Sequence, residues 1–282
     1  RETKLDAVMA KKVCETMSAA WPNIELIVSA RRISTDTVLQ HLGSIHRCFY
    51  ISSSKLSDLH YVSSVNTLRL KKLSHLSDVS CLSRVKILSF CECPLVEDVS
   101  ALGTCHELTI MKCDGVRDVG ALSSVHSLRL WVCPLVTDVS ALGSVHYLSL
   151  RTLPGVVNVS DLGTVNTLYL EDLVNVHDVS SLSCVHNLTV ADCPLVTDVS
   201  ALRTVYSLSL WTLPGVVNVS DLGSVNTLSL EGMGNVHDVS SLSGVHSLLV
   251  ADCPLVTDVS ALGTVYSLTL WELPNVRNVR DL

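Results

Sequence analysis

Aromatic residues are scarce in this sequence. Only 4% of its 282 residues are aromatic, although 48% are hydrophobic. Leucine, valine and small side chains must therefore fill whatever core the chain builds. No apolar run approaches the ~18 to 20 residues that a membrane-spanning helix needs. The sequence predicts a folded core built largely without aromatic rings and offers no candidate membrane span.

The common sequence signatures of catalysis are also missing. No Gly-x-Ser-x-Gly motif, phosphate-binding loop or His-Glu-x-x-His motif occurs. Serines are abundant only because a repeated pattern copies them, and few surface residues are unique enough to form a dedicated catalytic centre. We therefore expect no enzymatic activity, no cofactor and no bound metal.

Charge is low overall and unevenly distributed. The formal net charge is −7, which disfavours a nucleic-acid partner. Residues 1–72 hold 11 Lys or Arg against 6 Asp or Glu, whereas residues 73–282 hold 9 against 21. An asymmetry of this kind steers a charged partner but does not determine the fold.

The dominant feature of the sequence is an internal repeat. Leucine recurs every 20 residues from Leu68 to Leu268 without exception, and residues 151–210 match residues 211–270 at 49 of 60 positions. The repeat reads V-x-x-L-x-L-x-x-(C/L)-x-x-V-x-(D/N)-V-S-x-L-x-x. A fixed period of this length indicates a solenoid, in which each repeat buries its apolar side chains against its neighbours.

Residues 125–144, VHSLRLWVCPLVTDVSALGS, illustrate the expected structure of one repeat. The alternation over residues 127–131 predicts a short strand with Leu128 and Leu130 pointing inward. Because about 15 residues separate successive strands, the strands must stack in parallel rather than form hairpins. The spacing leaves room on the convex side for 3₁₀ or extended turns but not for an α-helix.

These patterns resemble the leucine-rich repeat. VHSLRLWVCPLVTD resembles the cysteine-containing subclass found in substrate receptors of ubiquitin ligases, and TDVSALGSV is similar to the internalin type. The resemblance covers about residues 45–282. It implies an α/β solenoid: a right-handed, horseshoe-like array with a parallel β-sheet on the concave face and short 3₁₀ or extended turns on the convex face.

Three regions are expected along the chain. Residues 1–22 show helical spacing of apolar residues and predict an N-terminal capping helix, because the end of a solenoid must be covered. Residues 23–64 hold two degenerate repeats, in which Cys48 and Tyr50 stand 20 residues before Leu68 and Leu70. Residues 65–282 form the regular array. The helix could also bind a partner.

The eleven cysteines favour free thiols over disulfides. Five of them share one repeat position with leucines, so that position is interpreted as a small buried apolar site. We therefore expect a reducing, intracellular (cytoplasmic) compartment rather than secretion. The cysteines at this position are Cys93, Cys113, Cys133, Cys193 and Cys253.

An acid or amide recurs every 20 residues, in a column that metal binding or catalysis could use. Asn replaces Asp at several positions, and a carboxylate function would not survive that exchange, whereas capping of a turn through the side-chain oxygen would. The column is therefore interpreted as structural. Its members are Asp78, Asp98, Asp118, Asp138, Asn158, Asp178, Asp198, Asn218, Asp238 and Asp258.

Three histidines, His106, His126 and His146, occupy one position in successive repeats and invite a zinc hypothesis. A straight column does not provide the tetrahedral arrangement that zinc prefers. The same position also holds Asn, Lys and Tyr in other repeats, so a polar corner is the favoured interpretation.

The outward positions of the strands are the candidate binding surface. Exposed Trp, Tyr and Arg are typical anchors of protein interfaces, and this face is basic early in the chain and acidic late. We therefore expect a protein partner of unknown identity on the concave face. The candidate residues are Arg69, Lys71, Arg129, Trp131, Tyr147, Arg151, Tyr169, Glu171, Trp211, Glu231 and Trp271.

Several alternatives remain open. The duplication could merely have copied Trp211 into Trp271, with these rings shielding strand edges. The cysteine-type resemblance implies a substrate-recognition part of a ubiquitin-ligase complex, for which residues 1–20 are too short to supply an adaptor-binding module. The internalin-type resemblance implies a secreted or cell-surface adhesive repeat protein. The favoured reading is a non-enzymatic scaffold that binds a protein.

Overall fold

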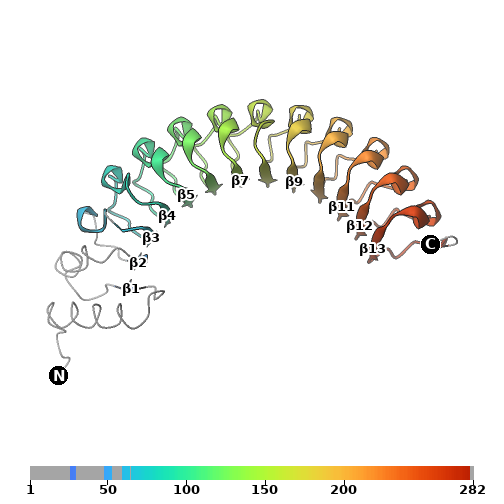
Figure 1. Ribbon diagram of the computed structural model, residues 1–282, viewed down its shortest axis with the longest axis horizontal. Coiled ribbons are helices and arrows are strands. Elements are labelled where there is room, and N and C mark those ends of the chain that lie inside the picture. Colours follow the sequence, from blue (N-terminus) through green and yellow to red (C-terminus); the bar gives the residue numbers. More distant parts are fainter. Residues whose placement is uncertain (1–25, 30–47, 53–58, 64, 280–282) are drawn as a thin grey trace, which may run out of the picture. The chain divides into compact units, whose positions relative to one another are not determined.

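The computed structural model describes residues 26–29, 48–52, 59–63 and 65–279 (Figure 1). The chain divides into two compact units, an N-terminal unit of residues 1–135 and a C-terminal unit of residues 136–282. The expected capping helix at residues 1–22 lies outside the described residues.

In its described residues the N-terminal unit holds six short parallel strands and four 3₁₀ helices. Each strand pairs with the next strand along the chain, from β1 through β6. The strands are β1 (Leu26–Ser29), β2 (Cys48–Ser52), β3 (Thr67–Lys71), β4 (Ile87–Cys91), β5 (Glu107–Met111) and β6 (Ser127–Trp131). The 3₁₀ helices are η1 (His60–Val62), η2 (Ser80–Leu82), η3 (Ser100–Thr104) and η4 (Gly120–Ser124).

The C-terminal unit shows the same pattern, with seven parallel strands in its described residues, again paired in chain order. The strands are β7 (Tyr147–Arg151), β8 (Thr167–Glu171), β9 (Asn187–Ala191), β10 (Ser207–Trp211), β11 (Thr227–Glu231), β12 (Ser247–Ala251) and β13 (Ser267–Trp271). The 3₁₀ helices are η5 (Ser140–Ser144), η6 (Ser160–Leu162), η7 (Ser180–Cys184), η8 (Ser200–Thr204), η9 (Ser220–Ser224), η10 (Ser240–Gly244) and η11 (Ser260–Thr264).

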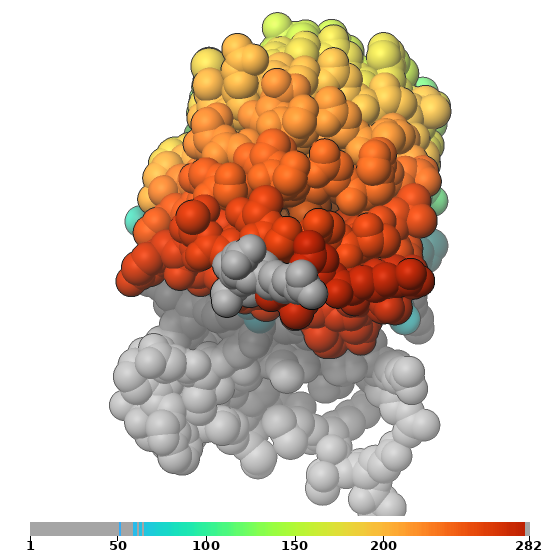
Figure 2. Space-filling model, turned by 90° about the vertical axis from the view of Figure 1, so that its right-hand side faces the viewer, coloured from blue at the N-terminus to red at the C-terminus, as the bar shows by residue number. Residues whose placement is uncertain are grey.

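The pairing register follows the sequence period in both units. Leu208 lies opposite Leu228, and each regular strand residue lies opposite the residue 20 positions further on. Viewed from its end, the C-terminal unit is a stack of layers in chain order, yellow to red in Figure 2. In each unit the strands lie on one side of the coil and the 3₁₀ helices on the other (Figure 1). The predicted solenoid is confirmed in each unit.

The core is a continuous ladder of aliphatic side chains. In the repeat that contains β7, Leu148, Leu150, Leu153, Val156 and Leu162 are all 0% exposed. Burial alternates along the strands because successive side chains point to opposite faces. The predicted inward orientation of the leucines is therefore confirmed.

The cysteine position is also buried, as predicted. All five cysteines of this column are 0% exposed and are free thiols. Burial raises the pKa of the Cys133 and Cys193 thiols to about 11. Cys193 donates a weak hydrogen bond to the carbonyl of Ala191 at 3.2 Å. These protonated thiols act as small apolar core groups.

The degenerate repeat at β2 corrects one sequence prediction. Phe49 lies opposite Leu68 and Ile51 opposite Leu70, so the spacing is 19 residues and not 20. Ile51 is 0% exposed. The prediction that aligned Cys48 and Tyr50 with these leucines was wrong by one residue. A slip of one residue turns a strand over, and the 19-residue spacing is the one that places Ile51 in the core.

Helical structure in the described part of the chain is entirely 3₁₀, which confirms the prediction of short convex turns. From η2 onward each of these turns begins after a valine with φ near −120°, as at Val139 and Val199, and the segments span three to five residues. In the described ranges, no helix is both long and apolar enough to cross a membrane.

Candidate binding surface

The residue after each regular strand adopts an unusual backbone conformation. Its φ is positive in every repeat from residue 72 to residue 272, with values from 45° at Asp252 to 59° at Lys72 among non-glycine residues. Gly232 is the one glycine at this position. The residue still donates its N–H to the next strand, as Asp192 does to the Trp211 carbonyl at 3.0 Å. The left-handed geometry turns the chain from the strand into the loop.

We define the strand face of each unit as the outward strand positions, which are the first, third and fifth, together with this left-handed residue. In β3 to β12 the second and fourth strand residues are buried in the core, which places the first, third and fifth on the opposite side of the sheet. The candidate residues predicted from the sequence all belong to this face.

In the N-terminal unit the strand face is basic. Arg69 is exposed, while Lys71, Arg129 and Trp131 are half-buried. The Arg129 guanidinium donates a hydrogen bond to the Ser127 hydroxyl at 3.3 Å. Part of the surface of Arg129 and Trp131 is thus buried within the unit and is not accessible to a partner.

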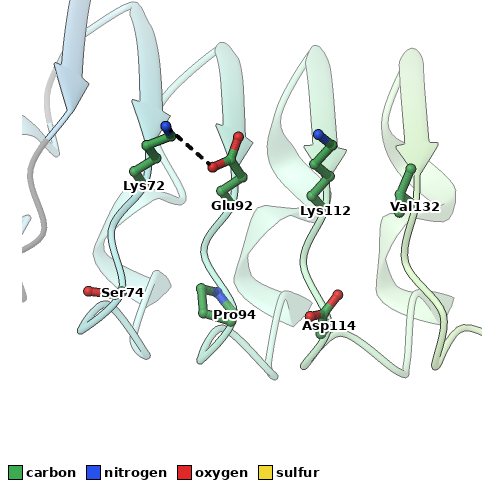
Figure 3. Close-up of a pocket in the computed structure, with 7 residues that line it drawn as sticks. All are labelled: Lys72, Ser74, Glu92, Pro94, Lys112, Asp114 and Val132. Carbon is green, nitrogen blue, oxygen red and sulfur yellow. Dashed lines mark ion pairs between the residues drawn. The ribbon is translucent and has the colours of Figure 1, made fainter.

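A shallow groove runs beside the ends of these strands (Figure 3). Its volume is about 580 Å³. The Lys72 ammonium lies 3.9 Å from the Glu92 carboxylate, and the two side chains point toward one another in Figure 3. An exposed pair of this kind contributes little stability. The groove is lined by Lys72, Ser74, Glu92, Pro94, Lys112, Asp114 and Val132.

In the C-terminal unit the structure brings four predicted residues together across β7 and β8. The rings of Tyr147 and Tyr169 lie 5.5 Å apart at an interplanar angle of 39°. Arg151 lies opposite Glu171 in the register, and its guanidinium is 3.1 Å from that carboxylate. Direct and diagonal neighbours on one sheet face interact in this way.

Further along, two tryptophans stand out from the sheet. Trp211 on β10 is 39% exposed and Trp271 on β13 is 62% exposed. Ala191 lies between Glu171 and Trp211 in the register and is only 3% exposed, so the flanking side chains cover it. The tryptophans therefore shield small neighbours and also present apolar surface to the solvent.

The acid and amide column is built from turns on the other side of the coil. In every repeat from Asp78 to Asp258 the side-chain Oδ1 accepts the backbone N–H two residues further on, at 2.8 to 2.9 Å. Hydrogen bonds from the Ser140 backbone and hydroxyl lower the pKa of Asp138. Asn158 makes the same backbone bond as the aspartates do.

The histidine column forms flat stacks of rings. His106 and His126 stack at 4.8 Å with an interplanar angle of 5°, and His186 stacks on Tyr206 at 4.7 Å. Nitrogens on parallel rings do not converge on a single point. Within the described ranges, no group of three or more His, Cys, Asp or Glu side chains is arranged to hold a metal ion.

Sequence reasoning identified the members of the strand face but not its local pairs. The diagonal contact of Tyr147 with Tyr169 depends on side-chain rotamers, and the groove beside Lys72 depends on the left-handed residues. Neither has a sequence signal, because ordinary Lys, Glu, Val and Thr fill the left-handed position. The predicted tryptophans are divided between the units: Trp131 lies on β6 of the N-terminal unit and Trp211 on β10 of the C-terminal unit.

No protein-family model matches the chain, and no curated protein matches its sequence. Solved structures do resemble it. An internalin (inlF) from Listeria monocytogenes superimposes with a TM-score of 0.60 at 19% identity, over 85% of this chain and 76% of that one. At this identity the likeness concerns the fold alone.

Two other solved structures match more loosely. The functional domain of InlJ from Listeria monocytogenes, which includes a cysteine ladder, has a TM-score of 0.47 at 17% identity, over 88% of this chain and 63% of that one. The leucine-rich repeat domain of the type III effector XCV3220 (XopL) has a TM-score of 0.49 at 13% identity, over 95% of this chain and 90% of that one.

Proposed function

Because the chain folds as a leucine-rich-repeat solenoid, we propose that it is a non-enzymatic scaffold that binds a protein partner on its strand face. The observation that carries this proposal is aromatic exposure on the outer side of a sheet. Trp211 and Tyr169 are 39% and 38% exposed. Tryptophan, tyrosine and arginine dominate the binding energy of protein interfaces.

The dimensions of the face favour an elongated partner. Strands in a sheet lie about 4.8 Å apart, so the seven strands from β7 to β13 give a surface on the order of 30 Å long. An extended or helical polypeptide segment can contact several strands of such a surface at once. A small molecule bound in one pocket would leave most of it unused.

Affinity capture with the purified chain tests this proposal. Partners captured from the native source are compared between the wild-type chain and the Trp131→Ala and Trp211→Ala variants. If the tryptophans are hot spots, each truncation weakens binding by about 2 kcal/mol or more, which reduces capture by at least an order of magnitude.

The matched control removes exposed apolar surface away from the strand face. Val157→Ala and Val217→Ala truncate side chains that are each 50% exposed in loops outside the strands. Capture should survive these changes. Loss of partners with the valine variants but not with the tryptophan variants would refute binding on the strand face.

A reducing, intracellular site of action is part of the proposal. The buried thiols of Cys93, Cys113, Cys133, Cys193 and Cys253 support it, because they pack as core groups and are unpaired. Thiol titration of the denatured protein from its native source should find these five cysteines reduced. Oxidised cysteines at these positions would instead favour a secreted or cell-surface adhesive protein.

A further inference from the structure

The strand face of the C-terminal unit is strongly acidic. Between residues 152 and 276 the sequence contains a single Lys or Arg, Arg203, and it lies in η8 on the side opposite the strands (Figure 1). Among the described residues of this face, Glu171 alone forms an ion pair, with the Arg151 guanidinium at 3.1 Å. The carboxylates of this face are Glu171, Asp172, Asp192, Glu231, Asp252 and Glu272.

The acidic face is also duplicated. Glu171, Ala191 and Trp211 lie side by side at the same position of three successive strands. The same series recurs as Glu231, Ala251 and Trp271 on the next three strands. Equivalent residues are three strands apart, which corresponds to about 14 Å along the sheet.

In each copy a residue with an exposed carboxylate forms a backbone hydrogen bond with an exposed tryptophan. Asp192 donates its backbone N–H to the carbonyl of Trp211 at 3.0 Å, and Asp252 does the same to Trp271 at 3.2 Å. A cation is attracted both to the face of an indole ring and to a carboxylate. Each tryptophan and aspartate pair thus combines two groups that recognise positive charge.

We propose that the strand face of the C-terminal unit binds a lysine- or arginine-rich polypeptide segment through two equivalent subsites, Trp211 with Asp192 and Trp271 with Asp252. This inference rests on the proposed function and specifies the chemistry of the partner. Charge complementarity selects this occupant, because an anionic partner would be repelled by every carboxylate of the face.

The spacing of the subsites adds a geometric requirement. An extended chain advances about 3.3 Å per residue, so side chains four residues apart lie about 13 Å apart on the same face. This separation is close to the distance of about 14 Å between the subsites. A segment with basic residues at positions i and i+4 can therefore reach both subsites while it runs across the strands.

Direct binding of a basic probe tests the proposal. Fluorescence anisotropy is measured with the full chain and labelled decalysine, with labelled decaglutamate as the matched anionic probe. Decalysine should bind and decaglutamate should not. Because exposed charges are screened by salt, the affinity for decalysine should fall several-fold between about 50 and 200 mM salt. Equal binding of the two probes would overturn the proposal.

A charge-matched pair of variants locates the site. The double variant Glu231→Gln and Asp252→Asn removes two carboxylates from the strand face. The control Asp161→Asn and Asp221→Asn removes two exposed carboxylates from η6 and η9. We expect decalysine affinity to fall about 3- to 10-fold in the first variant and to change less than about 2-fold in the control, since each exposed ion pair contributes modestly.

The tryptophans test the duplication. Trp211→Ala and Trp271→Ala should weaken decalysine binding by similar factors of about 2 to 5, as expected for an exposed cation–π contact. An effect of the control pair as large as that of the strand-face pair would show non-specific attraction to the net charge and overturn the proposal. An effect of only one tryptophan would overturn the two-subsite arrangement.

These outcomes are separable from failure of the proposed function. If strand-face tryptophan variants lose their captured partners while decalysine does not bind, the strand face is a protein-binding surface but its partner is not basic. If decalysine binds the strand face and no capture depends on a tryptophan, the proposed function fails and the electrostatic site stands.

Discussion

At the scale of single residues, the position after each strand carries the most unusual backbone geometry of the described chain. Ten non-glycine residues there have positive φ, among them the β-branched Val132, Thr152 and Thr212. β-Branched residues rarely adopt this conformation, because Cβ crowds the backbone. The strand register enforces it at eight of these ten residues, Thr152 and Thr212 among them, because each donates its backbone N–H to a carbonyl of the next strand.

Relief of this strain should stabilise the protein. Val132 has φ 56° and its side chain is half-buried at the rim of the groove. Val132→Gly should raise the free energy of unfolding by about 1 kcal/mol, because the left-handed conformation costs a non-glycine residue roughly 1–2 kcal/mol and glycine offsets part of that gain through the unfolded chain. Denaturant unfolding measures the change.

The reverse substitution is the control for this prediction. Gly232 has φ 64°, and a Cβ there would meet the Thr212 hydroxyl at 3.2 Å. Gly232→Val should therefore destabilise the protein. Stabilisation by both changes, or by neither, would contradict a strain confined to this position.

The capping aspartates predict a loss of stability in acid. Hydrogen bonds from the Ser140 backbone and hydroxyl hold the pKa of Asp138 below its ordinary value. A depressed native pKa means that the unfolded state binds more protons, so the stabilisation is complete above about pH 4 and is lost as the pH falls through the native pKa. The midpoint temperature of thermal unfolding should fall as the pH is lowered below about 4. This fall should be less steep in the Asp138→Asn variant than in the wild-type protein. Parallel curves would contradict this origin.

At the scale of elements, much of the fold was predictable because one residue type repeats at one position. The 20-residue leucine period determined the inward face of the regular strands, and the cysteine column was predictable because leucine replaces it. The β2 strand shows the limit. Its spacing of 19 residues to β3 breaks the period, and only the burial of Ile51 reveals the register. The side-chain pairs of the strand face depend on rotamers that no period encodes.

The leucine ladder gives a direct prediction of stability. Leu148 on β7 is 0% exposed, so Leu148→Ala should cost about 2–5 kcal/mol, the loss expected for a buried leucine that leaves a cavity. Denaturant unfolding measures it. Leu195→Ala is the matched control, because Leu195 is 49% exposed and should lose well under 1 kcal/mol. Equal losses would mean that the ladder position is not the core.

At the scale of the whole molecule, the duplication of repeats explains why the copied block is stable and why its outward residues recur. Each coil of a solenoid contacts only its neighbours, so a duplicated block of 60 residues folds as its original does. Its outward residues are copied too, which is why Trp211 and Trp271 each lie beside an alanine, Ala191 and Ala251, on the preceding strand. The sequence therefore predicted the members of the face, whereas the complementary chemistry of tryptophan and carboxylate became evident only when the strand register placed them side by side.

Because each repeat contacts only its neighbours, a substitution in the core should destabilise only the nearby repeats. Leu148→Asp places an unpaired charge in the core beneath β7, and burying such a charge is far costlier than leaving a cavity. Because stability in a repeat array is local, amide hydrogen exchange should lose protection in β7 and β8 while β11 and β12, three or more repeats away, keep theirs. The milder Leu148→Ala is the reference variant, with protection reduced only around β7. Uniform loss of protection throughout the C-terminal unit would instead show that its seven strands unfold as one cooperative block, and that the ladder couples distant repeats as strongly as adjacent ones.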